Sequence, residues 1–431
     1  MAFTAPVISL SADRLSGAVG ATADPVVTVT VSQHGAAPGD LSVAAVGSSD
    51  TFVAGAGDVT VGGRGATRRI SVRARGVGYC DLTLRVTGLG GRMSATTLHY
   101  AASGPVRHAA DTRYFTHACD ASAAVDVGDG HVVVADDETN VLRLYPRGAS
   151  GGPVRTWDFS AALGVGKEVD IEGAARAGDV IHWTGSMSNA KDGKLRADRS
   201  SLFTTTVRGF GASTELDFED SYGGLRDDLI AWDERNGGEL GFAAGAAKGR
   251  PPKRIDGFNV EGFEFAPGNT GTAYLGFRAP LVPAKPGGGA LLVPVTNADV
   301  LAAGGGPAEF GERIVLDLGG LSIRDLRKNS ADQYLIVAGS WAADDNTDPY
   351  ALYSWDGVPG HAPVRVMDLP TCDPGGWECV VDVPDLEVPG ARVQLITDSG
   401  SADWYGDGTE AKDLPHPELK KTRAVWFTVT E

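Results

Sequence analysis

Two stretches of the chain decide the fold: DIEGAARAGDVIHWTGS at residues 170–186 and NVEGFEFAPGNTGTAYLGFR at residues 259–278. Each begins with a polar residue and a Glu-Gly pair, continues as a hydrophobic strand, turns, and returns as a second strand. Three further segments follow the same plan less closely, at residues 121–134, 323–337 and 384–395. This repetition predicts five β-hairpins spaced along the chain.

A third strand follows each hairpin, and a fourth follows in four of the five units. The fourth strands share a hydrophobic-Asp-hydrophobic pattern: Trp157-Asp158-Phe159, Leu216-Asp217-Phe218, Leu316-Asp317-Leu318 and Met367-Asp368-Leu369. Four-stranded units repeated around an axis predict a five-bladed β-propeller. Residues 113–117 can complete the last unit. Six blades remain possible, because a partly helical insertion near residues 220–250 lengthens the spacing between the second and third units.

The residues before the repeat have a different rhythm. Short alternating strands separated by Gly-, Asp- and Ser-rich turns fill residues 1–103, which predicts an immunoglobulin-like β-sandwich. Residues 104–111 are then a linker and residues 112–431 the propeller. The predicted fold class is all-β.

Composition and charge exclude several classes of protein. The 431 residues carry a net charge of −17, which disfavours a nucleic-acid binder. No apolar run is long enough to span a membrane. No signal peptide is visible, so the compartment stays open: extracytoplasmic if such a segment was removed, cytoplasmic otherwise. Cys372 and Cys379 either close a small disulfide loop or remain buried thiols. The oligomeric state is open as well.

One residue per unit occupies an equivalent place near the start of the first strand. These residues are Ser122, Glu172, Glu261, Asp325 and Asp385. In a propeller the first strands line the central channel, so four carboxylates would meet at one mouth and repel each other. A Ca²⁺ ion, or another divalent cation, bound by Glu172, Glu261, Asp325 and Asp385 would compensate the charge. The alternative is that these carboxylates accept backbone N–H groups as structural residues.

The loops after the second strands lie on the same face as this ring. They span residues 136–140, 185–189, 339–345 and 398–401, together with Arg278 and the basic loop around Arg196 and Arg199. Guanidinium groups pair bidentately with phosphate or carboxylate. The predicted substrate-binding residues are Asp137, Ser186, Asn189, Arg196, Arg199, Arg278 and Asp398.

These motifs also resemble a known family. Asp170-Ile171-Glu172-Gly173 with Trp183-Thr184-Gly185-Ser186, Asn259-Val260-Glu261-Gly262 with Gly276-Phe277-Arg278, and Leu316-Asp317-Leu318-Gly319-Gly320 are similar to a bacterial propeller family classed as a domain of unknown function and related to propellers with esterase-like activity of phytase. The resemblance covers about residues 112–430. Met187 stands where the family pattern has histidine, and Asp385-Leu386-Glu387-Val388 departs from its Glu-Gly form.

Two functions follow from these features. The first is metal-dependent hydrolysis of a phosphoester, ester or lactone, with the ion polarising the scissile group and Glu172 or Glu261 acting as base. The second is a non-catalytic module that binds a small molecule, a glycan or a protein. The sequence has no Gly-x-Ser-x-Gly, His-Glu-x-x-His or phosphate-binding loop motif, so serine-triad, zincin and nucleotide chemistry lack support.

Overall fold

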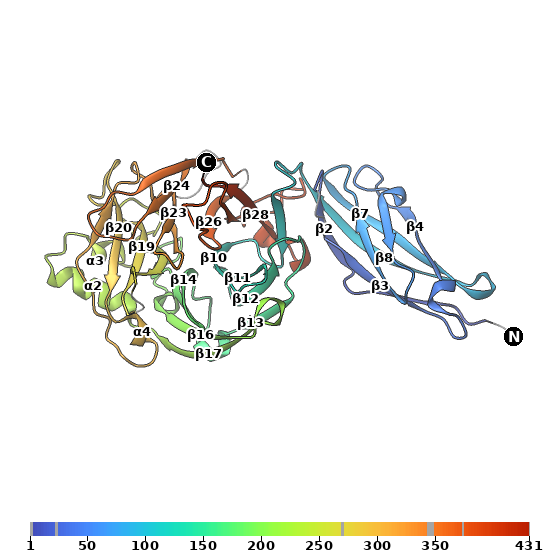
Figure 1. The fold of residues 1–431 in the computed structure, drawn as a ribbon, viewed down its shortest axis with the longest axis horizontal. Helices are drawn as coiled ribbons and strands as arrows, with labels where there is room; N and C mark the ends of the chain where they lie inside the picture. Colours follow the sequence, from blue (N-terminus) through green and yellow to red (C-terminus); the bar gives the residue numbers. More distant parts are fainter. Residues whose placement is uncertain (1–2, 22–24, 269–270, 343–348, 373–374, 431) are drawn as a thin grey trace. The chain divides into compact units, whose positions relative to one another are not determined.

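The structure is a computed structural model that describes residues 3–430, apart from 22–24, 269–270, 343–348 and 373–374. The described residues form seven four-stranded β-sheets (Figure 1). They divide into two compact units. Unit 1 comprises Met1–Cys119, Gly148–Pro153 and Gly400–Arg423, and unit 2 comprises Asp120–Arg147, Val154–Ser399 and Ala424–Glu431.

Two sheets of unit 1 form a β-sandwich. The first has the order β1 (Val7–Leu10), β3 (Val27–Ser32), β6 (Thr67–Val72), β5 (Val59–Gly62), and the second has the order β2 (Arg14–Ala18), β8 (Met93–Ser103), β7 (Gly78–Thr87), β4 (Ser42–Ser48). Their inward side chains share one core, in which Val29 and Ile70 of the first sheet and Leu82 and Leu98 of the second are fully buried. The alternation of buried and exposed residues along β7 is the pattern expected of a strand with one face on a core.

Five consecutive sheets form the blades of a β-propeller. The first blade has the order β10 (Ala121–Asp126), β11 (His131–Asp136), β12 (Thr139–Pro146), β13 (Arg155–Asp158), and the second has the order β14 (Ile171–Ala177), β15 (Val180–Gly185), β16 (Leu202–Arg208), β17 (Glu215–Tyr222). The third has the order β18 (Asn259–Phe265), β19 (Ala273–Ala279), β20 (Ala290–Val295), β21 (Ile314–Leu316), and the fourth has the order β22 (Ser322–Lys328), β23 (Tyr334–Gly339), β24 (Tyr350–Trp355), β25 (Val364–Leu369). The fifth has the order β26 (Gly376–Val380), β27 (Arg392–Asp398), β28 (Lys421–Thr428), β9 (Thr112–Thr116). The sheet order therefore places β9 beside β28, as expected for the strand that completes the last blade.

The first strands of the blades surround the central axis. β10 contacts β14, β14 contacts β18, β18 contacts β22, β22 contacts β26, and β26 contacts β10, so the ring is closed with five blades. The Asp-containing motifs of the first four blades lie at their outermost strands. Glycines after Glu172 and Glu261 let neighbouring first strands approach: a Cβ on Gly173 would lie 2.8 Å from Phe263 Cβ and 2.9 Å from its backbone nitrogen.

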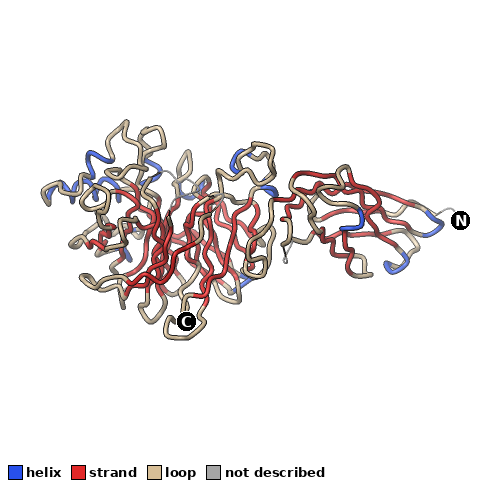
Figure 2. The backbone as a smooth tube through the Cα atoms, turned by 90° about the horizontal axis from the view of Figure 1, so that it is seen from above, coloured by secondary structure: helices blue, strands red, loops and turns tan. Residues whose placement is uncertain are grey.

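The insertion between the second and third blades contains two helices, α2 (Leu225–Arg235) and α3 (Phe242–Gly245). Leu225, Leu229 and Phe242 are fully buried against Phe258 and Phe277 of the third blade region, so the insertion extends that blade's core. Two further short helices are α1 (Ser160–Leu163) and α4 (Ala298–Leu301). The helices are few and short beside the strands (Figure 2). No described helix is long and apolar enough to cross a membrane.

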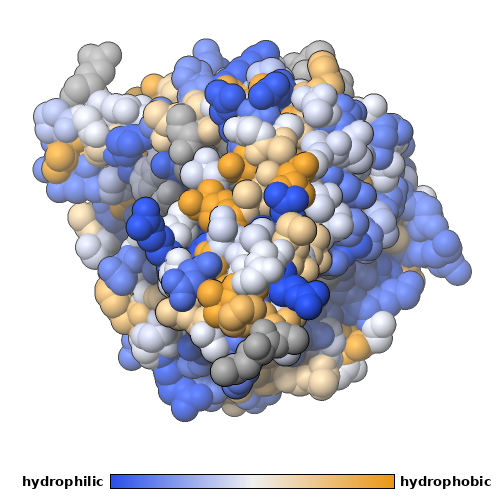
Figure 3. All heavy atoms as spheres, turned by 90° about the vertical axis from the view of Figure 1, so that its right-hand side faces the viewer, coloured by the Kyte–Doolittle hydropathy of each residue, from blue (hydrophilic) through white to orange (hydrophobic). Residues whose placement is uncertain are grey.

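All four cysteines are buried, and no disulfide joins Cys372 to Cys379. Of the two alternatives that the sequence leaves open, the structure has the buried thiols. The face of the molecule in Figure 3 shows small, separate hydrophobic areas among hydrophilic residues, which is ordinary for a folded protein surface.

Candidate functional site

A β-bulge interrupts the first strand of every blade, and the bulged residues form a ring at one mouth of the channel. In each case the pairing with the second strand skips one residue: Ser122, Glu172, Glu261, Arg324 and Glu378. A bulge aims the skipped side chain away from the regular pleat, and bulges are frequent next to functional sites. The five equivalent positions are therefore one serine, three glutamates and one arginine.

This register corrects the sequence alignment in two blades. Asp325 lies one residue beyond the bulge, fully buried, where its carboxylate accepts hydrogen bonds from the backbone nitrogens of Leu326 (2.8 Å) and Val380 (2.7 Å). Asp385 lies in the connection between β26 and β27 and is exposed. In the fourth blade the alignment favoured the acidic Asp325, whereas the bulged position holds Arg324. In the fifth blade a long first hairpin displaces the Pro-Asp-Leu segment from the strand.

Arginines compensate much of the charge of the ring. Arg324 Nε lies 2.8 Å from Glu261 Oε2 and 2.9 Å from Glu378 Oε2, and the Arg324 guanidinium also donates to the second oxygen of Glu378. Arg278 Nη1 donates to Glu261 Oε1 at 3.0 Å, and Asn259 Nδ2 donates to the same oxygen at 2.9 Å. The expected mutual repulsion of ring carboxylates is thus relieved at Glu261 and Glu378 by buried ion pairs.

The remaining acidic groups gather beside Glu172. Asp137, Asp170 and Glu172 each offer a carboxylate oxygen, and these oxygens all lie within 4.8 Å of one another. Asp137 also belongs to a second such group with Asp120 and Glu138. Asp137 follows β11, whereas Asp170 precedes β14 with a φ of 56°, in the left-handed region that non-glycine residues seldom adopt. We call Asp137, Asp170 and Glu172 the acidic cluster.

Burial and mutual repulsion raise the pKa values of this cluster. Burial raises the pKa of Asp137 well above its usual range, and the negative charges of Asp120, Glu172, Asp398 and Asp170 raise it further. The pKa of Glu172 is raised in the same way by burial, Glu261 and Asp170. Burial also raises the pKa of Asp170, although the positive charge of Arg199 opposes the shift. Asp137 Oδ1 is buried and accepts no hydrogen bond.

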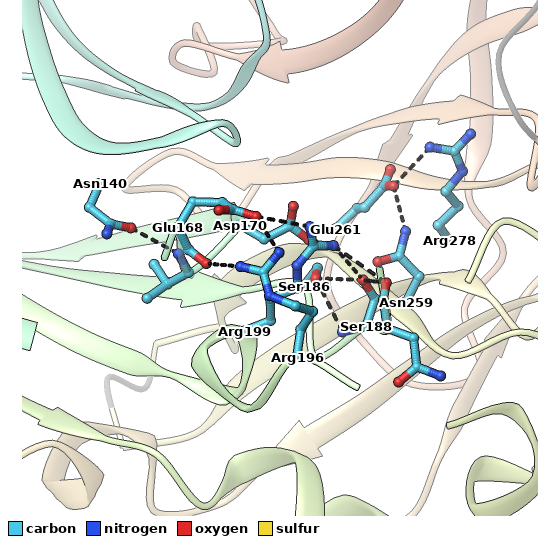
Figure 4. Close-up of polar contacts among 12 residues, drawn as sticks. Asn140, Glu168, Asp170, Ser186, Ser188, Arg196, Arg199, Asn259, Glu261 and Arg278 are labelled. Carbon is cyan, nitrogen blue, oxygen red and sulfur yellow. Dashed lines mark hydrogen bonds and ion pairs between the residues drawn. The ribbon is translucent and has the colours of Figure 1, made fainter. Parts of the chain in front are cut away.

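A network of polar side chains holds the second blade's part of the site (Figure 4). Arg199 Nη1 lies 2.7 Å from Asp170 Oδ2 and 3.1 Å from Ser188 Oγ, and its Nη2 lies 3.3 Å from Glu168 Oε1. Arg196 pairs with the same Glu168 oxygen at 2.5 Å. Because Arg199 also contacts Ser188 and Glu168, its ion pair fixes the position of Asp170 at the channel mouth.

Most of the predicted substrate-binding residues are committed to the protein interior. Ser186 is fully buried and bonded to Ser188, and Asn189 donates to the carbonyl oxygen of Ala247 at 2.9 Å and accepts from Arg226 at 2.8 Å. Arg278 is 1% exposed and paired with Glu261. Asp137 and Asp398 remain at the acidic cluster, as the influence of Asp398 on the pKa of Asp137 indicates. Residues 343–345 of the predicted loop 339–345 lie outside the described residues.

The sequence reasoning missed Asp170, Asp120, Arg324 and Glu378. Asp120 and Asp170 stand at the same spacing in two blades, two positions before the bulged residues Ser122 and Glu172. That signal was available in the Asp-Ile-Glu-Gly stretch. Arg324 and Glu378 could be found only from the bulge, which single-sequence patterns do not reveal.

At the other end of the channel Arg327 joins the blades together. Its guanidinium donates to the carbonyl oxygen of Ala124 on β10 at 2.8 Å and to that of Ala174 on β14. Its Nε donates to the carbonyl oxygen of Val380 on β26 at 3.4 Å, and its Nη1 lies 3.9 Å from Glu264 Oε2 of β18. One side chain from β22 therefore reaches the first strand of every other blade.

No family model and no curated protein matches this chain. Solved structures with partial similarity include the glutaminyl cyclase of Myxococcus xanthus, at 13% identity and a TM-score of 0.34 over 74% of this chain and 95% of that one. The aldose sugar dehydrogenase of Streptomyces coelicolor in its PQQ-bound form has 11% identity and a TM-score of 0.32 over 74% and 99% of the two chains. Virginiamycin B lyase from Staphylococcus aureus has 6% identity and a TM-score of 0.26 over 98% and 99%. Similarity this weak assigns no substrate or reaction to this chain.

Proposed function

We propose that the propeller is a metal-dependent hydrolase that holds a divalent cation, Ca²⁺, at the acidic cluster of Asp137, Asp170 and Glu172. The observation that carries the proposal is the buried atom Asp137 Oδ1. It accepts no hydrogen bond, and the groups clustered with it are other carboxylates. A buried carboxylate oxygen left without a hydrogen-bond donor is costly. A cation in contact with all three carboxylates removes that cost.

The donor set favours Ca²⁺ over transition metals. All the acidic-cluster ligands are carboxylate oxygens, the ligand class that Ca²⁺ and Mg²⁺ take, and no histidine belongs to the cluster. Asp120 and Glu138 lie beside Asp137 and can raise the number of oxygen ligands. Ca²⁺ accepts 6–8 oxygens in irregular geometry, which suits ligands from two blades better than the octahedron of Mg²⁺.

The chemistry that such an ion supplies is polarisation of an ester carbonyl or phosphoryl oxygen, and a lowered pKa of bound water. Glu172 is the better candidate for the base, because Glu261 is held by Arg278, Arg324 and Asn259. In the proposed mechanism Glu261 orients Arg278, Arg324 and Asn259 and is not the base. Since the arginines of the site are bonded internally, a neutral ester or lactone suits it better than a multiply charged phosphoester.

A second candidate function is a binding module in which the ion and ring are structural. The observation favouring it is that Glu261, Arg324 and Glu378 of the ring are held in buried pairs with one another. The two candidates differ in turnover, not in metal binding.

Hydrolysis of p-nitrophenyl acetate, a γ-lactone and p-nitrophenyl phosphate, with Ca²⁺ and after chelation, separates them. We expect Ca²⁺-dependent turnover of the ester or lactone, a loss of at least ~100-fold in Glu172→Gln, since general-base catalysis typically contributes 10²–10⁴-fold, and unchanged turnover in Asp385→Asn, whose carboxylate is exposed outside the ring. Turnover that survives both chelation and Glu172→Gln would refute the proposed mechanism. Metal binding without turnover of any of the three would favour the binding module.

A further inference from the structure

A cleft separate from the channel opens within unit 1. Its volume is about 340 Å³, and all its lining residues belong to that unit. The cleft lies between strands of the sandwich and the segment Gly400–Arg423. Pockets that bind small molecules commonly begin at about 300 Å³. Its volume therefore suits a ligand of one or two rings.

The sheet builds one wall by its register. Tyr79 and Asp81 point to the same side of β7, two residues apart, and Asp81 pairs across the sheet with His99 of β8, which pairs in turn with Arg14 of β2. His99 Nδ1 lies 2.7 Å from Asp81 Oδ1. A row of guanidinium, imidazole, carboxylate and phenol groups thus crosses three strands beside the cleft. Buried Tyr100 contributes to its apolar lining.

The opposite wall is tied to the sandwich. The Tyr405 hydroxyl donates to the carbonyl oxygen of Leu419 at 2.7 Å and lies 2.8 Å from Ser16 Oγ. Lys421 Nζ donates to the carbonyl oxygen of Gly17 at 2.8 Å. Because these bonds are buried, the two walls have a fixed spacing, which reduces the entropy lost when a ligand binds.

Tyr79 is a lining residue of the cleft whose aromatic side chain remains partly exposed. It is 40% exposed, its ring centroid lies 5.0 Å from that of Tyr405, and its hydroxyl donates to Asp407 Oδ2 at 3.1 Å. The ring of Tyr79 is thus held in place with part of its surface open in the cleft lining, and such aromatic side chains supply contact area to a ligand at low entropic cost.

The chemistry of the lining restricts the ligand. Arg14 is the one arginine or lysine of the lining, against the two carboxylates of Asp81 and Asp407, so this lining does not favour a phosphate or nucleotide. Carboxylates, a guanidinium and imidazoles alternate as hydrogen-bond acceptors and donors around an aromatic ring. Hydroxyl groups can use both kinds of partner, and the C–H face of a pyranose packs on the ring of an aromatic residue. We infer that this cleft binds a neutral carbohydrate, with one pyranose ring on Tyr79.

Calorimetric titration of the full chain with maltose, cellobiose, xylobiose and N,N′-diacetylchitobiose tests the inference. We expect at least one disaccharide to bind, Tyr79→Ala to weaken it at least tenfold, and Tyr79→Phe to retain most of the affinity because the ring remains. Phe210→Ala, which removes an exposed aromatic residue from the propeller, is the matched control and should bind as the wild type does.

Melting temperatures of the variants show whether each one folds. If Tyr79→Ala fails to fold, Asp407→Asn takes its place, since Asp407 is exposed and its loss should still weaken binding. The inference is overturned if none of the four sugars binds, or if binding persists in the folded cleft variants. It is overturned as well if binding is lost in Glu172→Gln, which would place the sugar at the acidic cluster. Inorganic phosphate should not bind the cleft, and competition by phosphate would also contradict it.

Discussion

At the scale of single residues, Asp137 and Glu261 show how neighbouring charges decide the state of an acid at the channel mouth. Both lie at the channel mouth, but Glu261 receives two arginines and an amide, whereas the charges around Asp137 are negative. Sequence reasoning places both residues at the site, Glu261 near the start of a first strand and Asp137 in the loop after a second strand. It cannot distinguish them, since the arginines come from other positions along the chain.

Glu264 provides a prediction on pH. Burial raises its pKa to about 7, although Arg327 and the backbone nitrogens of Phe265 and Lys328 oppose the shift. A carboxyl group whose pKa is higher in the folded state stabilises the fold below its ordinary pKa near 4.5, and this contribution is lost as the pH rises through 7. We expect Glu264→Gln to gain up to about 3 kcal/mol over the wild type at pH 8 to 9, and little at pH 4.

Urea unfolding at several pH values measures the effect of Glu264→Gln. Glu387→Gln is a suitable control, because Glu387 is exposed in a connection and should leave the pH profile unchanged. Parallel profiles of the wild type and Glu264→Gln between pH 4 and 8 would show that Glu264 titrates normally.

At the scale of elements, the bulged first strand is the unit on which the site is built. The sequence reveals the strands, because hydrophobic alternation and the Glu-Gly pair repeat, and it places Ser122, Glu172 and Glu261 at equivalent positions. It does not reveal the equivalence of Arg324 and Glu378, because a bulge leaves no fixed residue type behind. Alignment by residue chemistry therefore shifted Asp325 by one residue and placed exposed Asp385 in the ring.

The close approach of neighbouring first strands gives a prediction at Gly173. A Cβ added there would lie 2.8 Å from Phe263 Cβ and 2.9 Å from the Phe263 nitrogen, so the backbone of β18 would have to move. We expect Gly173→Ala to destabilise the protein by about 1–3 kcal/mol, the usual cost of overpacking. Gly166 is exposed with no atom within 4 Å of an added Cβ, and Gly166→Ala should have little effect. Equal unfolding midpoints in urea for the two variants would contradict this packing.

Arg324 links three blades, and its removal gives a second prediction at this scale. Arg324→Met leaves Glu261 and Glu378 buried with one partner fewer each. Breaking a buried ion pair by removing one partner typically costs 3–5 kcal/mol, because the other charge stays uncompensated. Chemical denaturation should show a loss of about that size. A loss below about 1 kcal/mol would mean that these acids are protonated or reach water.

At the scale of the whole molecule, the all-β class and the five-bladed ring could be predicted from repeats, since each blade carries its own strand pattern. The division into two compact units could not be predicted from the sequence, because unit 1 includes the distant segments Gly148–Pro153 and Gly400–Arg423. Trp404 and Tyr405 of the latter segment share a core with Ala18 and Ala101 of the sandwich. Such packing between distant segments leaves no periodic signal in the sequence.

Truncation tests the role of β9. A chain that begins at residue 108 keeps β9, so it should retain one cooperative unfolding transition, with a lower melting temperature because the shared core of Trp404 and Tyr405 is uncovered. A chain that begins at residue 119 lacks the fourth strand of the last blade and should not fold cooperatively. Identical melting curves of the two chains would show that β9 does not close the ring.

The central claim is that the acidic cluster binds a cation, and calorimetric titration of the chelator-treated full chain with Ca²⁺ tests it most directly. We predict one site in the wild type, loss of that site in Asp137→Asn and in Glu172→Gln, and an unchanged site in Asp385→Asn. At 100 times Kd the bound ion should stabilise the wild type by about 2.7 kcal/mol, seen as a rise in melting temperature. No binding of Ca²⁺, Mg²⁺ or Mn²⁺ to the wild type, or equal binding to Asp137→Asn, would contradict the claim.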